Sequence, residues 1–255
     1  MCSDHDETTV GGAALAEAIL ALGSARDVVV LTGAGVSVES GIPDFRSVGG
    51  LWERFDPFEY ATRGAFREDP HRCWQLFDEL GGLVRGAIPN AAHLALARWE
   101  THLARMTIVT QNIDGLHQKA GCQQVLEFHG GASALLCIDC GARFDAPAGR
   151  GDPWPPLCAC GKVLKPDIVL FGDPIPMGVW ERSVAAIEGA EGVLVIGTSA
   201  QVAPFSELPW IAARGGLPVV EINLEPTGLS RLPTIFVEGA AGAMVPALVG
   251  GILGG

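Results

Sequence analysis

Six short runs of β-branched and other apolar residues recur along this chain, and segments with helical spacing separate most of them. The alternation predicts an α/β fold built on a doubly wound parallel sheet. We expect strands at residues 27–31, 107–110, 124–128, 193–196, 218–222 and 234–237. Five of these runs lead into polar or glycine-containing loops. Because ligands bind beyond the carboxyl ends of the strands in such sheets, the five loops predict one shared site.

Two segments interrupt this rhythm. Residues from about 45 to 89 carry aromatic and charged residues at helical spacing, and residues 137–161 hold four cysteines and a proline-rich stretch. Both are typical of insertions that together form a second, smaller domain. The expected division is a large domain of residues 1–44, 90–130 and 165–255, and a small domain made of a helical insertion at 45–89 and a zinc ribbon at 131–164.

Composition narrows the class of protein. With 255 residues, 48% hydrophobic and 18% charged, the chain is expected to bury one substantial core and a small appended module. A net charge of −12 argues against binding to nucleic acid and favours basic protein segments as partners. The first nine residues are polar and acidic, and no apolar stretch is long enough to span a bilayer. We therefore expect a cytoplasmic protein with no membrane partner.

The cysteines predict a metal site. Cys137 and Cys140 form one close pair, and Cys158 and Cys160 form another. Four thiolates at this spacing can hold one tetrahedral zinc and leave no open position, so the ion is expected to be structural. Glycine follows each pair and suits a tight turn around the metal. The alternative is four buried thiols without a metal.

Three motifs carry the candidate chemistry. Residues 32–46 contain TGAGVS and SGIPDFR directly after an apolar strand, so the glycines can give the backbone close access to a pyrophosphate. Residues 110–117 read TQNIDGLH and residues 127–130 read EFHG, each after a strand. In content and order, these motifs resemble the sirtuin (Sir2) family of NAD-dependent protein-lysine deacylases, and the resemblance extends from residue 27 to about residue 248.

The resemblance implies a Rossmann-like large domain that binds NAD. It implies that His129 is the general base, a role that suits an imidazole near neutral pH, that Asn112 orients the ribose and a water, and that Asp114 holds nicotinamide with Ile113. Gln111 resembles a ribose contact and Phe45 a lid over the reacting sugar. The full set of expected NAD contacts is Gly33, Ala34, Gly35, Ser37, Asp44, Phe45, Arg46, Gln111, Asn112, Ile113, Asp114, Gly197, Thr198, Ser199, Asn223, Glu225 and Ala241.

Residues 165–173 resemble the family's substrate-binding segment, an extended edge that can pair with an acyl-lysine peptide. Val169, Phe171 and Gly172 are the expected contacts, and the family usually has Glu where this chain has Asp173. Relatives that prefer acidic acyl groups carry Tyr and Arg at the positions of Phe77 and Leu80. Without a guanidinium, an acyl carboxylate would be costly to bury, so we expect a neutral acyl group, acetyl or longer.

An alternative reading has both Phe77 and Leu80 simply facing the core of the small domain. Tyr60 and Arg63 repeat the Tyr and Arg spacing but come too early in the chain.

The implied reaction is attack of the acyl oxygen on C1′ of the nicotinamide ribose, followed by release of lysine and 2′-O-acyl-ADP-ribose. Zinc would take no part. Two alternatives use the same pocket, protein ADP-ribosyl transfer and NAD hydrolysis, and a third is a non-catalytic binding module. Two further histidines, His93 and His117, are expected to be structural.

Overall fold

The computed structural model describes residues 7–45, 49–147 and 151–254. A six-stranded parallel sheet with the order β3-β2-β1-β7-β8-β9 forms the centre of the larger part. From β1 the chain adds β2 and β3 on one side of the sheet, and then β7, β8 and β9 on the other side. This change of side between β1 and β7 is the Rossmann-like topology expected. The six expected strands are confirmed as β1 (Asp27–Thr32), β2 (Arg105–Thr110), β3 (Val125–Glu127), β7 (Gly192–Ile196), β8 (Val219–Asn223) and β9 (Thr234–Glu238).

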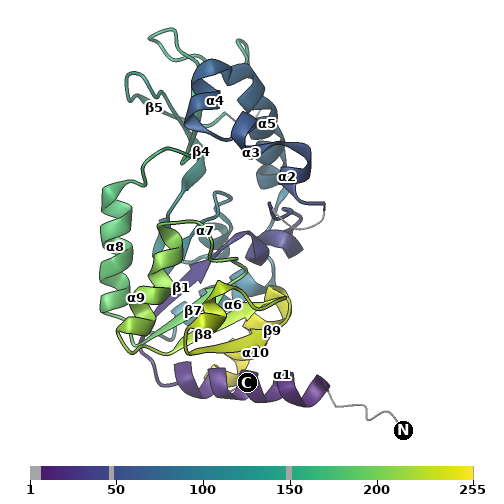
Figure 1. The fold of residues 1–255 in the computed structure, drawn as a ribbon, viewed down its shortest axis with the longest axis vertical. Coiled ribbons are helices and arrows are strands. Elements are labelled where there is room, and N and C mark those ends of the chain that lie inside the picture. Colours follow the sequence, from purple (N-terminus) through teal and green to yellow (C-terminus); the bar gives the residue numbers. More distant parts are fainter. Residues whose placement is uncertain (1–6, 46–48, 148–150, 255) are drawn as a thin grey trace.

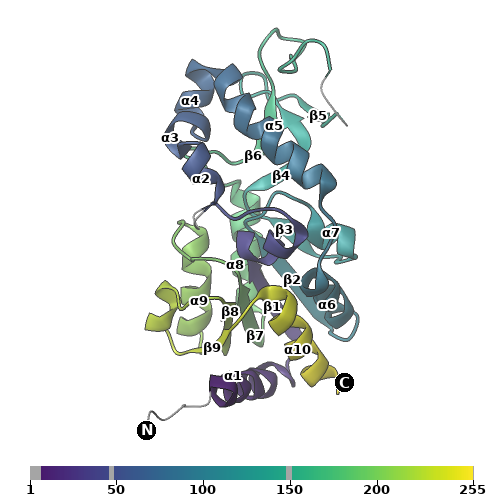
Figure 2. The ribbon, with the colours of Figure 1, turned by 90° about the vertical axis from the view of Figure 1, so that its right-hand side faces the viewer.

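Helices cover both faces of this sheet (Figures 1 and 2). Strand β1 shows why, since Val28 and Val30 enter one hydrophobic cluster and Val29 and Leu31 enter the other. The first cluster is closed by α1 (Glu7–Leu22), α6 (Ala91–Glu100) and α10 (Ala241–Leu253), and the second by α8 (Met177–Glu188) and α9 (Leu208–Arg214). Strands buried on both faces read as continuous apolar runs, the pattern that identified them. Among the described residues, no helix is long and apolar enough to cross a membrane.

The helical insertion begins its helices at recognisable caps. Asp56, Thr62 and Asp69 each accept a backbone N–H at the N-terminus of a helix, and proline occupies the first turn of two of these helices. The helices are α2 (Leu51–Arg54), α3 (Pro57–Tyr60), α4 (Arg63–Glu68) and α5 (Pro70–Gly86). They lie at the opposite end of the molecule from α1 (Figure 1).

A three-stranded antiparallel sheet completes this small domain: β4 (Gly130–Leu136), β5 (Arg143–Asp145) and β6 (Lys165–Ile168), in the order β5-β4-β6. We did not predict strand β4, because a run of glycine, alanine and serine has little strand propensity of its own. Strand β6 pairs with β4, so this sheet continues past the expected domain boundary at residue 165. The exact division into domains stays a prediction.

Helix α5 packs on the sheet through its aromatic face. The Trp74 indole N–H donates to the carbonyl oxygen of Leu164 (2.8 Å), and its ring lies edge-on to Trp154 with centroids 4.8 Å apart. Phe77 also packs edge-on with Trp74, with ring centroids 5.6 Å apart. Because these contacts join the helical insertion to the cysteine-bearing segment, the two insertions share one core.

Candidate active site

A single large cavity of about 1240 Å³ extends from the carboxyl ends of the parallel strands to the helical insertion. It brings together most of the expected site residues. Those expected to contact NAD are Ala34, Gly35, Asp44, Phe45, Gln111, Asn112, Ile113, Gly197, Thr198, Ser199, Asn223, Glu225 and Ala241; His129 and the expected substrate contacts Phe77, Leu80, Val169, Phe171 and Gly172 line the same cavity.

Four of the expected NAD contacts are not among the described residues that line the cavity. Arg46 lies outside the described residues. Gly33, Ser37 and Asp114 lie behind the cavity wall, and both Ser37 and Asp114 are buried. They can therefore act only through the residues in front of them.

The glycines after β1 allow two loops to pack closely against each other. Gly33 has a φ of −125°, a value open to any residue, so no unusual backbone conformation explains it. A Cβ on Gly35 would lie 2.7 Å from the Cα of Gly197, and Gly35 N–H donates to the Gly197 carbonyl (2.8 Å). The glycines let the loop after β1 lie directly against the loop after β7, which brings two walls of the cavity together.

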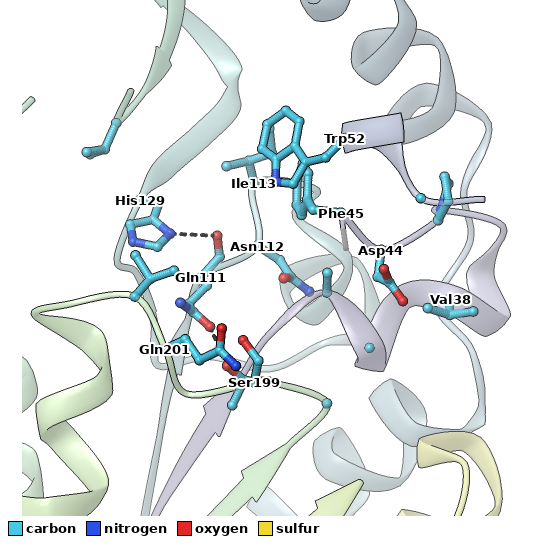
Figure 3. Close-up of a pocket in the computed structure, with 18 of the residues that line it drawn as sticks. Val38, Asp44, Phe45, Trp52, Gln111, Asn112, Ile113, His129, Ser199 and Gln201 are labelled. Carbon is cyan, nitrogen blue, oxygen red and sulfur yellow. Dashed lines mark hydrogen bonds between the residues drawn. The ribbon is translucent and has the colours of Figure 1, made fainter. Parts of the chain in front are cut away.

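His129 lies at the cavity wall, between β3 and β4, with its Nδ1 3.2 Å from the carbonyl oxygen of Gln111 (Figure 3). Burial lowers the pKa of His129, and the hydrogen bond to Gln111 partly opposes that shift. The imidazole is therefore held neutral near pH 7, in the form that can accept a proton. Phe128, next to it in the chain, is fully buried and packs edge-on against its ring.

A short chain of hydrogen bonds fixes Gln111. Its side-chain oxygen accepts the hydroxyl of Thr198 (2.7 Å), and the Thr198 carbonyl accepts the amide of Asn223 (3.0 Å). Gln111 and Thr198 follow β2 and β7, and Asn223 is the last residue of β8. The chain thus ties together three loops that line the cavity and sets the position of the carbonyl to which His129 donates.

Asn112 stands on a buried polar support. Its amide donates to Ser37 Oγ (3.1 Å) and to the Gly33 carbonyl (3.1 Å), and Ser37 Oγ donates to Asp114 Oδ2 (2.8 Å). Asp114 also accepts the backbone N–H of Leu116, at the start of α7 (Leu116–Ala120). Buried donors and acceptors that are satisfied in this way hold one conformation, so Ser37 and Asp114 fix the side chain of Asn112.

The two remaining buried histidines have structural partners. His117 Nε2 lies 3.0 Å from Thr32 Oγ1, and His93 completes a capping box with Asn90 at the start of α6. Their rings lie 4.8 Å apart. Burial lowers the pKa of both, that of His117 to about 3, so both are neutral.

The arm of the cavity within the small domain is apolar. Leu76, Phe77 and Leu80 of α5 line it together with Ile113 and Ile168. Phe77 and Leu80 also belong to the small domain's core, so each of these residues contributes both to the cavity wall and to the core. Tyr60 packs edge-on against Phe55 and is not among the cavity-lining residues.

Several cavity residues were not anticipated from the sequence. The main one is Trp52 of α2, whose ring lies 5.0 Å from Phe45 and 6.3 Å from Phe171 (Figure 3). Trp52 comes six residues after the DFR motif. Its aromatic side chain and its closeness to that motif were the only signals in the sequence that pointed to it. Trp180, Glu39 and Thr227 were also missed.

Two acidic residues shape the far end of the cavity. Glu39, from η1 (Ala34–Ser40), accepts the backbone N–H of Gly242 at the start of α10. Glu221 is buried and accepts the hydroxyl of Thr227 (2.7 Å), and burial raises its pKa. Both contacts fix backbone that lines the cavity, around Ala241 and along residues 223–227.

The four cysteines are arranged as a metal centre. Their Sγ atoms lie within 4.8 Å of one another, with Cys137 to Cys160 and Cys140 to Cys158 each at 3.5 Å. A tetrahedral zinc with bonds of about 2.3 Å requires sulfur separations of roughly 3.8 Å, so the donor set fits. The glycine after each pair has positive φ, 75° at Gly141 and 81° at Gly161, as tight turns around a metal require.

Comparison with known proteins identifies the arrangement. Residues 33–204 match the Sir2 family. The chain belongs to the Sir2 family. The NAD-dependent protein deacylase 2 of Pyrobaculum aerophilum is 42% identical over 231 residues, which is 89% of this chain and 92% of that protein. The sirtuin resemblance drawn from the motifs is confirmed, as is the α/β fold with its small domain.

Two solved sirtuin structures show how closely the fold agrees. A Sir2 homologue variant in complex with 2′-O-acetyl ADP ribose matches with a TM-score of 0.88 and 35% identity, covering 93% of this chain and 96% of that one. The structure of Sir2Af2 bound to a myristoylated histone peptide matches with a TM-score of 0.77 and 29% identity, covering 94% and 97%.

Proposed function

We propose that this sirtuin is an NAD-dependent protein-lysine deacylase that yields nicotinamide, deacylated lysine and 2′-O-acyl-ADP-ribose. The proposal rests on the position of His129, which lies where the polar arm of the cavity meets the apolar arm. One arm offers hydroxyl, amide and backbone groups suited to a dinucleotide, and the other suits an acyl-lysine side chain. The deacylase activity named for the Pyrobaculum relative supports this assignment.

The residues of the site have separate roles in the proposed reaction. NAD supplies the ribose that accepts the acyl group and is consumed. His129 accepts a proton from a ribose hydroxyl at Nε2, since its Nδ1 is engaged with Gln111. Asn112 and Gln111 orient the ribose from their fixed positions. Ile113 lines the nicotinamide end, and Asp114 acts from behind the wall by holding Ser37 and, through it, Asn112. Phe45 with Trp52 covers the reacting sugar and limits water.

The acyl group is neutral in this proposal. No arginine or lysine among the described residues lines the cavity, so an acyl carboxylate would be buried without a cation. A second cavity of about 50 Å³ adjoins the first and shares Phe77, Leu80, Ile113 and Ile168 with it; its other lining residues include Asp78 and Arg85. That space favours acyl chains longer than acetyl, in line with the myristoylated peptide bound by Sir2Af2.

Zinc belongs to the small domain in this proposal. Cys137, Cys140, Cys158 and Cys160 hold one ion and fill its coordination sphere, so it has a structural role. We also propose a cytoplasmic location, supported by the thiols held for metal instead of disulfides. Acyl-lysine proteins are the proposed partners, and the net charge of −12 disfavours nucleic acid.

Mass spectrometry tests the function. Purified protein is incubated with NAD and acetyl-, decanoyl-, myristoyl- and succinyl-lysine peptides, alongside H129A and the exposed-histidine control H102A. Deacylated peptide with 2′-O-acyl-ADP-ribose, lost in H129A and kept in H102A, is expected. Nicotinamide release without deacylation would assign ADP-ribosyl transfer or NAD hydrolysis, and no NAD turnover would assign a binding module.

A further inference from the structure

A buried lysine lies beneath the segment that is proposed to bind the peptide. Lys165, at the start of β6, is 3% exposed. Its ammonium donates to the carbonyl oxygens of Pro166 (3.3 Å) and Ile168. Burial lowers its pKa, while Asp173 raises it. A buried ammonium is costly unless it is paired and hydrogen-bonded, so this lysine requires an explanation.

Asp173 is the partner of this lysine at the other end of the same segment. Its Oδ2 lies 3.8 Å from Lys165 Nζ and accepts the backbone N–H of Leu170 (3.2 Å). Its Oδ1 lies 3.6 Å from Nε of Arg63, at the start of α4. One carboxylate therefore joins the two ends of the segment to the helical insertion.

The segment between the two charges is anchored from both sides. Val169 N–H donates to the carbonyl of His129 (2.8 Å). Phe171 N–H donates to the Ala61 carbonyl, and the Phe171 carbonyl accepts the N–H of Arg63, both at 2.9 Å. Across the described ranges, no backbone hydrogen bond uses the Val169 carbonyl or either backbone group of Gly172. Those groups are left at the exposed edge, where an incoming peptide strand can pair.

We propose that Lys165, paired with Asp173, is a positioning residue for acyl-lysine peptide binding. The ammonium holds the Ile168 carbonyl on the buried side of the segment and keeps Asp173 close to the segment's other end. The segment is thereby curved, and the curve directs the Val169 carbonyl and Gly172 outward. Removal of the ammonium leaves the buried Ile168 carbonyl without this donor and takes a cation from beside the largely buried Asp173 carboxylate, so the loop relaxes. The inference rests on the proposed function, because it names what positions the peptide at that site.

The test compares K165M with K165R and with K162M, which alters an exposed lysine three residues away. Binding of a fluorescent acetyl-lysine peptide, peptide KM, NAD KM, zinc content and thermal unfolding are measured for each. We expect K165M to raise the peptide dissociation constant and KM about tenfold or more, with NAD KM and zinc content unchanged. K165R should recover part of the loss, and K162M should match the wild type.

Asp173 supplies a second, independent test should K165M not fold. D173N keeps an acceptor for the Leu170 N–H but removes the charge, and we expect it to raise the peptide dissociation constant severalfold. Wild-type peptide binding in either folded variant, or an equal rise in NAD KM, would overturn the inference. If wild-type protein binds peptide without turning it over and K165M loses binding, the inference stands and the proposed chemistry fails. If wild-type protein binds no peptide, both fail.

Discussion

The Nδ1 atom of His129 lies 3.2 Å from the backbone carbonyl oxygen of Gln111. A carbonyl oxygen can only accept, so Nδ1 carries the proton and Nε2 keeps the lone pair. The tautomer needed for a general base is thus set by the backbone that follows β2. Because Thr198 in turn fixes Gln111, the orientation of the base depends on the loops after two strands.

This contact predicts the acid side of the pH–rate profile. Burial lowers the pKa of His129 below its ordinary value of 6.5, and the base works only when neutral. We expect kcat/KM for peptide to be independent of pH near neutrality and to fall below pH 6.5, as the imidazole gains a proton. H129A should lose about 10²- to 10⁴-fold in rate at neutral pH and should lack this acid limb. An acid limb centred above pH 7 would contradict this assignment.

Exchange of two residues should change acyl preference. F77Y with L80R places a phenol and a guanidinium in the apolar arm, where a dicarboxylic acyl group could pair with the cation. We expect succinyl-lysine peptide to become a substrate and decanoyl-lysine turnover to fall about tenfold or more. Peptide turnover with each acyl group, at saturating NAD, is the measurement. F77Y alone serves as the control, because without the guanidinium it should gain no succinyl activity.

Zinc removal should affect the small domain first. We expect C140S, or chelation of the wild type, to remove one zinc per chain and to lower thermal stability, because two thiolate pairs close this module. Peptide turnover should fall as well, because the same core contains Phe77 and Leu80. Metal analysis and circular dichroism check this, with D139A, an exposed position between two ligands, as the control. Full zinc content in C140S would contradict the assignment.

His117 should make the fold sensitive to mild acid. Its pKa is about 3 in the folded protein, against 6.5 ordinarily, because of burial and the neighbouring His93. The charge of Asp114 raises the pKa of His93 and so opposes the effect of burial there. The stability due to neutral His117 is complete above pH 6.5 and is lost as the pH falls from 6.5 toward 3, at about 1.4 kcal/mol per pH unit.

Urea unfolding at pH 7.5 and 5.5 measures this effect. H117F should be less stable than the wild type at pH 7.5, since Thr32 loses a partner, but should lose about 1 kcal/mol less on acidification. The same pH dependence in both proteins would show that another group controls acid stability.

The sequence pattern predicted those features that depend on residues close together in the chain. Runs such as 193–196 are short, continuous, rich in β-branched residues and buried on both faces, so they identify a central strand. The cysteine pairs and their following glycines form turns within a few residues, so the metal centre could also be inferred. Strand β4 could not be predicted, because it is a strand only through its partners β5 and β6.

The sequence by itself determined the parallel sheet, the metal ligands and the residue types around the NAD cavity, because each depends on chain periodicity or on short motifs. Only the tertiary structure decided that Gly35 packs against Gly197, that Trp52 covers Phe45, and that Lys165 faces Asp173. The first two contacts join segments that are unrelated in sequence or separated by a turn, and the third closes a loop. The Gly35 contact forms when β1 and β7 pair in the large sheet, and the other two form within the small domain and the segment beside it. Burial then gives these contacts their energetic weight.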